Sequence, residues 1–196
     1  MALNRVVAAA MLLMAFPHVV VSERVRAGAG HRVARWWVRA GGRCTGVRFE
    51  QSGTAVAGHD GLQILAANHS SPVDIAAILA THPTARFVAG ADLFRLPLLA
   101  SAMRAIGTVP VDRKSGSGRL EVPAGTAGVL AVFPEGAIAP PGRRLPFHRG
   151  AFALAIAAGA EVVPVAIHHS ARSLPPKAAL GVLGMAIARR LRAEGA

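Results

Sequence analysis

The chain has 196 residues, of which 53% are hydrophobic, and its formal charge of +12 comes from 20 arginines and only two lysines. This length favours one domain with a sizeable core, and the charge suits an anionic partner: nucleic acid, an anionic membrane surface or a phosphorylated substrate. The high hydrophobic content favours lipid, although a nucleic-acid binder driven by charge alone stays open as an alternative. The single cysteine excludes an intramolecular disulfide and a cysteine-based zinc cluster.

The first segment is an apolar run over Val6–Val21 that contains Pro17. It is shorter than the ~20 residues that a membrane-spanning helix usually needs. Three interpretations are open: a signal peptide, a short span or re-entrant anchor, and an ordinary core helix. We favour the anchor, because charged residues separate the run from the small-residue site Ala27-Gly28-Ala29, where a signal peptide would be cleaved.

A helix is predicted next over His31–Ala40, because apolar residues recur there at helical spacing, at Val33, Trp36, Trp37 and Ala40. Basic residues fall on another face, at Arg32, Arg35 and Arg39. This pattern is typical of an interfacial helix on anionic lipid, and the alternative is a core helix with solvated arginines. Gly41-Gly42 is expected to break the helix, and a loosely alternating strand is expected over Arg43–Gln51.

The stretch from Asn68 to Asp74 joins a predicted strand to a predicted helix. Ser71 and Asp74 have the spacing of a capping box, with Ser71 as the N-cap and Pro72 as the first helical residue. This helix start can fold His69 back towards Asp74, whose carboxylate would hold one imidazole nitrogen and leave the other free as a base. The structural alternative is that Asp74 only caps the helix and His69 only satisfies a loop carbonyl.

Strands and helices alternate over the rest of the chain. The predicted strands are Leu62–Ala67, Arg86–Ala89, Thr108–Val111, Gly128–Phe133 and Glu161–Ile167, and the predicted helices are Asp74–His82, Leu93–Ile106, Phe147–Ala160 and Ala178–Ala193. Loops are expected over Lys114–Thr126 and Ala137–Pro146. This alternation implies an α/β fold with a largely parallel sheet. The carboxyl edge of such a sheet would gather His69, Arg113 and Glu135 in one crevice.

Four blocks follow one another in the chain: Asn68-His69-x4-Asp74, Gly107 to Arg113, Phe133-Pro134-Glu135-Gly136 and Val163-Pro164-Val165. In this order they resemble the glycerolipid acyltransferase family, the type that makes phosphatidic acid from lysophosphatidic acid. The resemblance covers about Gly61 to Ile167. It implies a single α/β domain of glycerol-3-phosphate acyltransferase-like fold over residues 41–170, between N-terminal membrane-associating helices at 1–40 and a C-terminal helical tail at 171–196. It also implies association with the cytoplasmic face of the cell membrane.

The family chemistry assigns a role to each block. His69 is the expected base and Asp74 its orienting carboxylate, while the arginine fork of Arg113 suits a phosphate group. By the resemblance, the substrate-binding residues are Asn68, Gly107, Arg113, Phe133, Pro134, Glu135 and Gly136. The implied acceptor is a lysophospholipid, most of all 1-acyl-sn-glycerol 3-phosphate, and the donor is acyl-CoA or acyl-carrier protein, with no cofactor and no metal.

Two departures from the family pattern leave an alternative open. A lysine often stands in the family where Gly90 stands here, and a threonine or serine and an arginine are usual where this chain has Ala137–Ala139. Arg143 and Arg144 could substitute for the missing arginine. The alternative is a lipid-binding or scaffold protein of the same fold with weak or no turnover.

Overall fold

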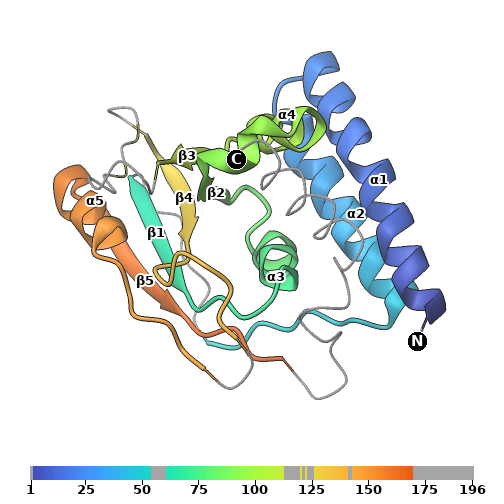
Figure 1. Ribbon diagram of the computed structural model, residues 1–196. Helices are drawn as coiled ribbons and strands as arrows, with labels where there is room; N and C mark the ends of the chain where they lie inside the picture. Colours follow the sequence, from blue (N-terminus) through green and yellow to red (C-terminus); the bar gives the residue numbers. More distant parts are fainter. Residues whose placement is uncertain are drawn as a thin grey trace, which may run out of the picture.

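The computed structural model describes residues 2–53, 61–112, 120, 122, 126–140 and 143–169, and its centre is a five-stranded sheet (Figure 1). The strands stand in the order β3-β2-β4-β1-β5, and every neighbouring pair is parallel. Their bounds are Leu62–Ala67 (β1), Arg86–Gly90 (β2), Val109–Val111 (β3), Gly128–Val132 (β4) and Glu161–Val165 (β5). The predicted α/β class and its parallel sheet are therefore confirmed.

Helices cover both faces of this sheet (Figure 1). Helix α5 (Gly150–Ala158) covers one face, while α3 (Val73–Thr81) and α2 (Ala29–Thr45) lie on the other. The neighbouring residues Ile64 and Leu65 of β1 are both fully buried, each in a different one of the two apolar clusters. Successive side chains of a strand point to opposite faces, so an apolar run such as β1 suits a strand that is buried on both sides.

Helix α1 (Ala2–Val25) and α2 pack against each other as a hairpin beside the sheet (Figure 1). Glu23, near the end of α1, accepts hydrogen bonds from the backbone N–H groups of Gly28 (2.9 Å) and Gly30 (2.8 Å). These bonds satisfy donors at the start of α2, and they hold the pKa of the Glu23 carboxyl below its usual value. Further along the hairpin, the indole N–H of Trp37 donates to Nδ1 of His18 at 3.1 Å.

The apolar run Val6–Val21 lies within α1, which continues through Pro17. Among the helices that the structure describes, none combines the length and the hydropathy needed to cross a bilayer.

The glycine pair in α2 does not end the helix, contrary to prediction. The helix continues to Thr45, and it ends at Gly46, whose φ of 74° is the left-handed conformation typical of a helix end. Gly42 has a packing role instead, because a Cβ at this position would lie 2.7 Å from the carbonyl oxygen of Val47. The absence of a side chain at Gly42 thus lets the following segment return close to the helix.

The predicted strand over Arg43–Gln51 is wrong for the same reason. Its first three residues belong to α2, and residues 46–51 form a turn and irregular chain. The expected domain boundary after residue 40 accordingly falls inside α2. The face that packs on the core also differs from the predicted apolar face. Ala34 and Val38, which lie outside the predicted set, pack against the core, whereas Trp36 of that set is 57% exposed.

Two further helices differ from their predicted bounds. The predicted helix Leu93–Ile106 is divided into a 3₁₀ helix, η1 (Ala91–Arg95), and α4 (Pro97–Ala105). Leu96 between them is extended, with φ −92° and ψ 105°, because a residue before proline is disfavoured in helical conformation. Helix α5 begins three residues later than predicted. The predicted terminal helix Ala178–Ala193 and most of the predicted loop Lys114–Thr126 lie outside the described residues.

Candidate active site

The turn between β1 and α3 is held by hydrogen bonds that cap the helix. The Ser71 hydroxyl accepts from the Val73 backbone N–H at 3.2 Å, and the Asp74 carboxylate accepts from the Ser71 N–H at 2.9 Å. The bond to Asp74 is the half that the predicted capping box requires, whereas the Ser71 hydroxyl bonds the N–H of Val73 rather than that of Asp74. Pro72 already has helical dihedral angles, φ −57° and ψ −21°, which agrees with its predicted place at the helix start.

The same carboxylate holds His69. Oδ2 of Asp74 lies 2.9 Å from Nδ1 of His69 and also accepts the Ser70 N–H at 2.8 Å. An ionised carboxylate can only accept hydrogen bonds, so Nδ1 carries the shared proton. In the neutral ring Nε2 is then unprotonated, and this is the nitrogen that a general base uses. The structure thus brings the predicted pair together in the predicted orientation.

Asp74 is fully buried, and its ionised form is stabilised by hydrogen bonds. Burial by itself raises the pKa of a carboxyl group. Hydrogen bonds from His69, from the Ser71 and Ser70 backbone and from His169 outweigh burial and hold the pKa of Asp74 below its usual value. The carboxylate is therefore charged near neutral pH and can stabilise an imidazolium that forms on His69.

His169 is a second histidine on this carboxylate, and sequence reasoning missed it. Its Nε2 lies 2.6 Å from Oδ1 of Asp74, although the two residues are 95 positions apart in the chain. The sequence carries one signal for it, because the pair His168-His169 follows the last predicted strand, whose carboxyl end belongs to the same sheet edge as His69.

Asn68 joins β1 to the chain that follows β5. Its side-chain Nδ2 donates to the carbonyl oxygen of Ile167 at 3.0 Å, and its Oδ1 accepts from the Ile167 N–H at 2.7 Å. Both ends of the amide are thus bonded to one backbone unit. The structure gives Asn68 a part in aligning two strand ends, and its role in binding substrate stays a prediction.

Glu135 fixes the main chain on two sides of the site. It is only 4% exposed, Oε1 accepts the His69 N–H at 3.0 Å, and Oε2 accepts the Leu145 N–H at 3.1 Å. In addition, the Ala139 N–H donates to the His69 carbonyl oxygen at 2.8 Å. The role in substrate binding that the resemblance implies for Glu135 stays a prediction, and a bond to substrate would have to share an oxygen that already accepts a backbone N–H.

The remaining residues of this block lie against the histidines. The Phe133 ring stacks on the His69 ring, with centroids 4.0 Å apart and planes inclined by 15°, so it restricts rotation of the imidazole. Pro134 accepts the His148 N–H through its carbonyl oxygen at 2.8 Å. Gly136 has φ 67°, and a Cβ there would lie 3.0 Å from the His148 ring, so the turn requires glycine.

Gly107, the first residue of the second predicted block, does not join the residues around His69. Gly107 precedes β3 and therefore lies at the amino edge of the sheet. Its φ is 65° and a Cβ there would lie 2.9 Å from the Arg86 side chain, so it has a structural role just after α4. Arg113 lies outside the described residues, since it is the first residue of the gap that follows Asp112.

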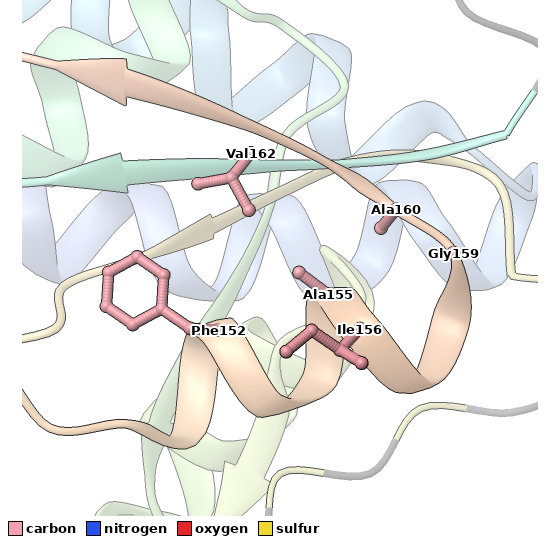
Figure 2. Close-up of a pocket in the computed structure, with 6 residues that line it drawn as sticks. All are labelled: Phe152, Ala155, Ile156, Gly159, Ala160 and Val162. Atoms are coloured by element: carbon pink, nitrogen blue, oxygen red, sulfur yellow. The ribbon is translucent and has the colours of Figure 1, made fainter.

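An open apolar hollow of about 480 Å³ lies between α5 and β5 (Figure 2). Its lining residues are Phe152, Ala155, Ile156, Gly159, Ala160 and Val162. Val162 pairs with Ile64 in the middle of β1, whereas the site follows the end of that strand at Ala67. The lining offers no acid, base or nucleophile, so this hollow is separate from the chemistry at His69. Within the described part of the chain, no group of three or more histidine, cysteine or acidic side chains could hold a metal ion.

Known proteins with similar sequences are acyltransferases. The chain is 25% identical over 186 residues to a chloroplastic 1-acyl-sn-glycerol-3-phosphate acyltransferase of Brassica napus, covering 88% of this chain and 52% of that protein. It is 27% identical over 118 residues to a chloroplastic protein of the same name from Arabidopsis thaliana, covering 57% of this chain and 33% of that one. The chain thus spans about half or less of the length of these relatives.

The fold has a counterpart among solved structures, the 1-acyl-sn-glycerophosphate acyltransferase PlsC of Thermotoga maritima. The two share a TM-score of 0.55 and 17% identity over 100% of this chain and 96% of that one. The model of the Acyltransferase family matches residues 43–168, which include every block around His69. Because this match covers more than half of the chain, the protein belongs to the acyltransferase family.

Proposed function

We propose that this protein transfers a fatty acyl group from acyl-CoA or acyl-carrier protein to a lysophospholipid, with 1-acyl-sn-glycerol 3-phosphate as the preferred acceptor and phosphatidic acid as the product. One observation carries the proposal: the His69 ring is held through Nδ1 by a buried carboxylate, which leaves Nε2 free to act as a base. The names of the two chloroplastic relatives support the choice of acceptor.

The reaction follows from the orientation of this ring. Nε2 of His69 removes the proton of the acceptor hydroxyl as its oxygen attacks the thioester carbonyl carbon, and Asp74 stabilises the imidazolium that forms. When the tetrahedral intermediate collapses, the carbon–sulfur bond breaks and the imidazolium returns its proton to the departing thiolate. The products are an ester and a free thiol, and the enzyme itself is never acylated.

The acceptor phosphate is assigned to Arg113. This residue follows β3, and β3 stands three strand positions from β1 in the sheet order. At ~4.8 Å per strand the distance between the two strand ends is roughly 14 Å, which the acceptor and an arginine side chain can bridge together. The guanidinium fork suits a phosphate dianion because it combines charge with two parallel donors.

Acyl transfer to a panel of acceptors tests this function. Purified protein is given labelled acyl-CoA or acyl-carrier protein and either lysophosphatidic acid or a lysolipid without a phosphate monoester, such as lysophosphatidylcholine. We expect turnover with lysophosphatidic acid, and Arg113→Ala should raise its KM roughly ten- to a hundred-fold with little change in the KM of the donor. Binding of lysolipid without turnover from either donor would contradict the proposal and favour the lipid-binding alternative.

We further propose that the α1–α2 hairpin lies on an anionic bilayer, at its cytoplasmic face. The described outer face of α1 is largely apolar, with Leu13, Met14, Val21 and Val25 all at least 55% exposed. Exposed residues of α2 form a basic stripe with one tryptophan, at Arg32, Trp36, Arg39 and Arg43. The hydrogen bond from Trp37 to His18 joins the two helices. Exposed apolar residues can enter the acyl boundary of a bilayer, and exposed arginines can bind lipid phosphates. Together they are typical of helices that lie in the membrane interface.

Sedimentation with vesicles tests this attachment. Replacing Arg32, Arg39 and Arg43 by serine should weaken binding to vesicles that contain phosphatidylglycerol by roughly a hundred-fold, at about 1 kcal/mol for each arginine. The matched control removes the same charge elsewhere, through serine at Arg143, Arg144 and Arg149, and should bind almost as well as wild type. Equal loss in both variants would mean that net charge alone drives binding, and stronger binding to DNA than to vesicles would favour the nucleic-acid alternative.

A further inference from the structure

The two oxygens of the Asp74 carboxylate accept different numbers of hydrogen bonds. Oδ2 accepts three hydrogen bonds, from His69 Nδ1 and from the Ser70 and Ser71 backbone N–H groups. Among the described residues, Oδ1 has a single donor, Nε2 of His169. Because Asp74 is 0% exposed, water does not readily replace that donor. Without the His169 imidazole, Oδ1 of Asp74 would therefore be buried without a hydrogen-bond donor.

The position of His169 is itself fixed by the sheet edge. The Asn68 side chain is hydrogen-bonded to both the N–H and the carbonyl oxygen of Ile167, two residues before His169. Exposure alternates along this segment, since Ala166 and His168 are exposed whereas Ile167 and His169 are partly buried. Because Asn68 fixes the backbone at Ile167, the side chain of His169 points towards the site and that of His168 towards solvent.

We infer that His169 is a second positioning residue of the active site, which holds the Asp74 carboxylate through Oδ1 so that Oδ2 presents the correct geometry to His69. This inference rests on the proposed acyl transfer. His169 acts through Asp74 and needs no contact with substrate.

The charges around Asp74 indicate the form in which His169 acts. The carboxylate supplies one negative charge, and the imidazolium that forms on His69 during the reaction requires it. Neutral His169 with its proton on Nε2 donates to Oδ1 without competing for that charge. The other acidic group at this point, Glu135, bonds to the backbone of His69 and Leu145. The cluster thus works best with His169 as a neutral donor.

Three variants separate a positioning role from a structural one. His169→Leu keeps much of the volume but removes the donor, His169→Gln restores an N–H at the end of a side chain of similar length, and His168→Leu changes the exposed neighbour as the matched control. For each variant kcat, both KM values and the pH profile of kcat/KM are measured, with thermal unfolding as the check on folding.

We expect His169→Leu to lower kcat roughly ten- to a hundred-fold with KM values near wild type. The acid limb of its kcat/KM profile should move to higher pH, because a carboxylate that has lost a donor holds the proton on its remaining partner more strongly. His169→Gln should recover most of kcat and return the acid limb, and His168→Leu should match wild type. A folded His169→Leu variant with wild-type kcat and an unmoved limb would overturn the inference, as would a His169→Gln variant no better than His169→Leu.

The failure of the proposed function has a different signature. If wild-type protein transfers no acyl group to any acceptor, nitrogen-detected NMR of the imidazoles still tests the arrangement. His169 should then appear as the tautomer protonated on Nε2, and His169→Leu, unlike His168→Leu, should shift the His69 ring signals. A His169 ring protonated on Nδ1 alone, or His69 signals that do not respond, would overturn the inference without reference to turnover.

Discussion

The sheet edge around His69 differs from the junction between the α1–α2 hairpin and the core in whether its buried polar atoms are hydrogen-bonded. At the sheet edge, Asn68, Asp74 and Glu135 each use both side-chain ends in hydrogen bonds of 2.6–3.1 Å. At the junction, His31, Arg35 and His82 each keep a buried nitrogen without a partner among the described residues. Catalysis requires fixed geometry, whereas apolar contacts of Ala34 and Val38 are enough to hold a helix on a core.

The largest expected effect comes from breaking the pair at the sheet edge. His69→Ala should lower kcat roughly 10²- to 10⁴-fold, the usual contribution of a general base, while the protein stays folded. Asp74→Asn should cost as much or less, because it keeps the ring but offers an N–H where His69 needs an acceptor. Steady-state kinetics and circular dichroism measure both. A folded His69→Ala variant that kept most of its turnover would show that another group is the base.

The second largest effect is expected at Glu135, in stability as well as turnover. Glu135→Ala leaves the backbone N–H groups of His69 and Leu145 without their acceptor, which should lower the free energy of unfolding by about 2–4 kcal/mol. Glu135→Gln keeps one acceptor oxygen and should lose less. Urea unfolding gives the free energies, and kcat reports the displaced His69. If the two variants were equally stable, these bonds would contribute little to the fold.

As the pH falls, the junction should lose stability before Asp74 at the sheet edge is protonated. Burial lowers the pKa of both His31 and His82 from the ordinary value of 6.5. Unfolded protein therefore binds protons more readily, so stability is complete above about pH 6.5 and falls as the pH drops below it. The pKa of Asp74 is lowered from 3.8, and its contribution is lost only when the pH falls below about 4. The loss of stability at His31 and His82 is measured by thermal unfolding between about pH 7.5 and 5, a range that brackets the ordinary histidine pKa.

The matched variants for this prediction are His31→Leu and the exposed His168→Leu. The first removes a buried ionisable group and should flatten the decline in unfolding temperature below about pH 6.5, whereas the second should leave the decline as in wild type. An unchanged decline in His31→Leu together with a flat profile in His82→Leu would assign the acid sensitivity to the end of α3 alone.

The smallest effect is expected at the turn of the hairpin. Glu23→Ala removes the acceptor of the Gly28 and Gly30 N–H groups, and the loss of such a helix cap costs about 0.5–1 kcal/mol. Glu23→Gln should retain part of this. Because the pKa of Glu23 is lowered from 4.5, the difference between wild type and Glu23→Gln should be present at neutral pH and vanish as the pH falls below about 4.5. A difference that persisted at pH 3 would exclude the charge as its cause.

Much of the sheet and part of the site could be predicted from the sequence, because their signals are local. Ser71 and Asp74 are three residues apart, so the capping box and the approach of His69 to Asp74 follow from the start of one helix. The five strands are short apolar runs separated by helical or turn signals, and each was predicted close to its observed bounds. The errors in α2 also have a local cause, since Gly42 is a packing glycine that looks like a helix breaker.

The sequence predicted that His69 and Glu135 share the sheet edge, but the tertiary structure alone decided which atoms of distant residues bond there. Strand order brings β4 and β5 to the two sides of β1, so Glu135 reaches the backbone of His69 and His169 reaches Asp74 across 95 residues. The same order puts β3 three positions away and leaves Gly107 at the opposite edge. Local sequence determines where a strand begins and ends, but the neighbours of a strand depend on how all the helices and strands share one core. For that reason the residues of the His69 turn were readable from the sequence, whereas the second histidine on Asp74 was not.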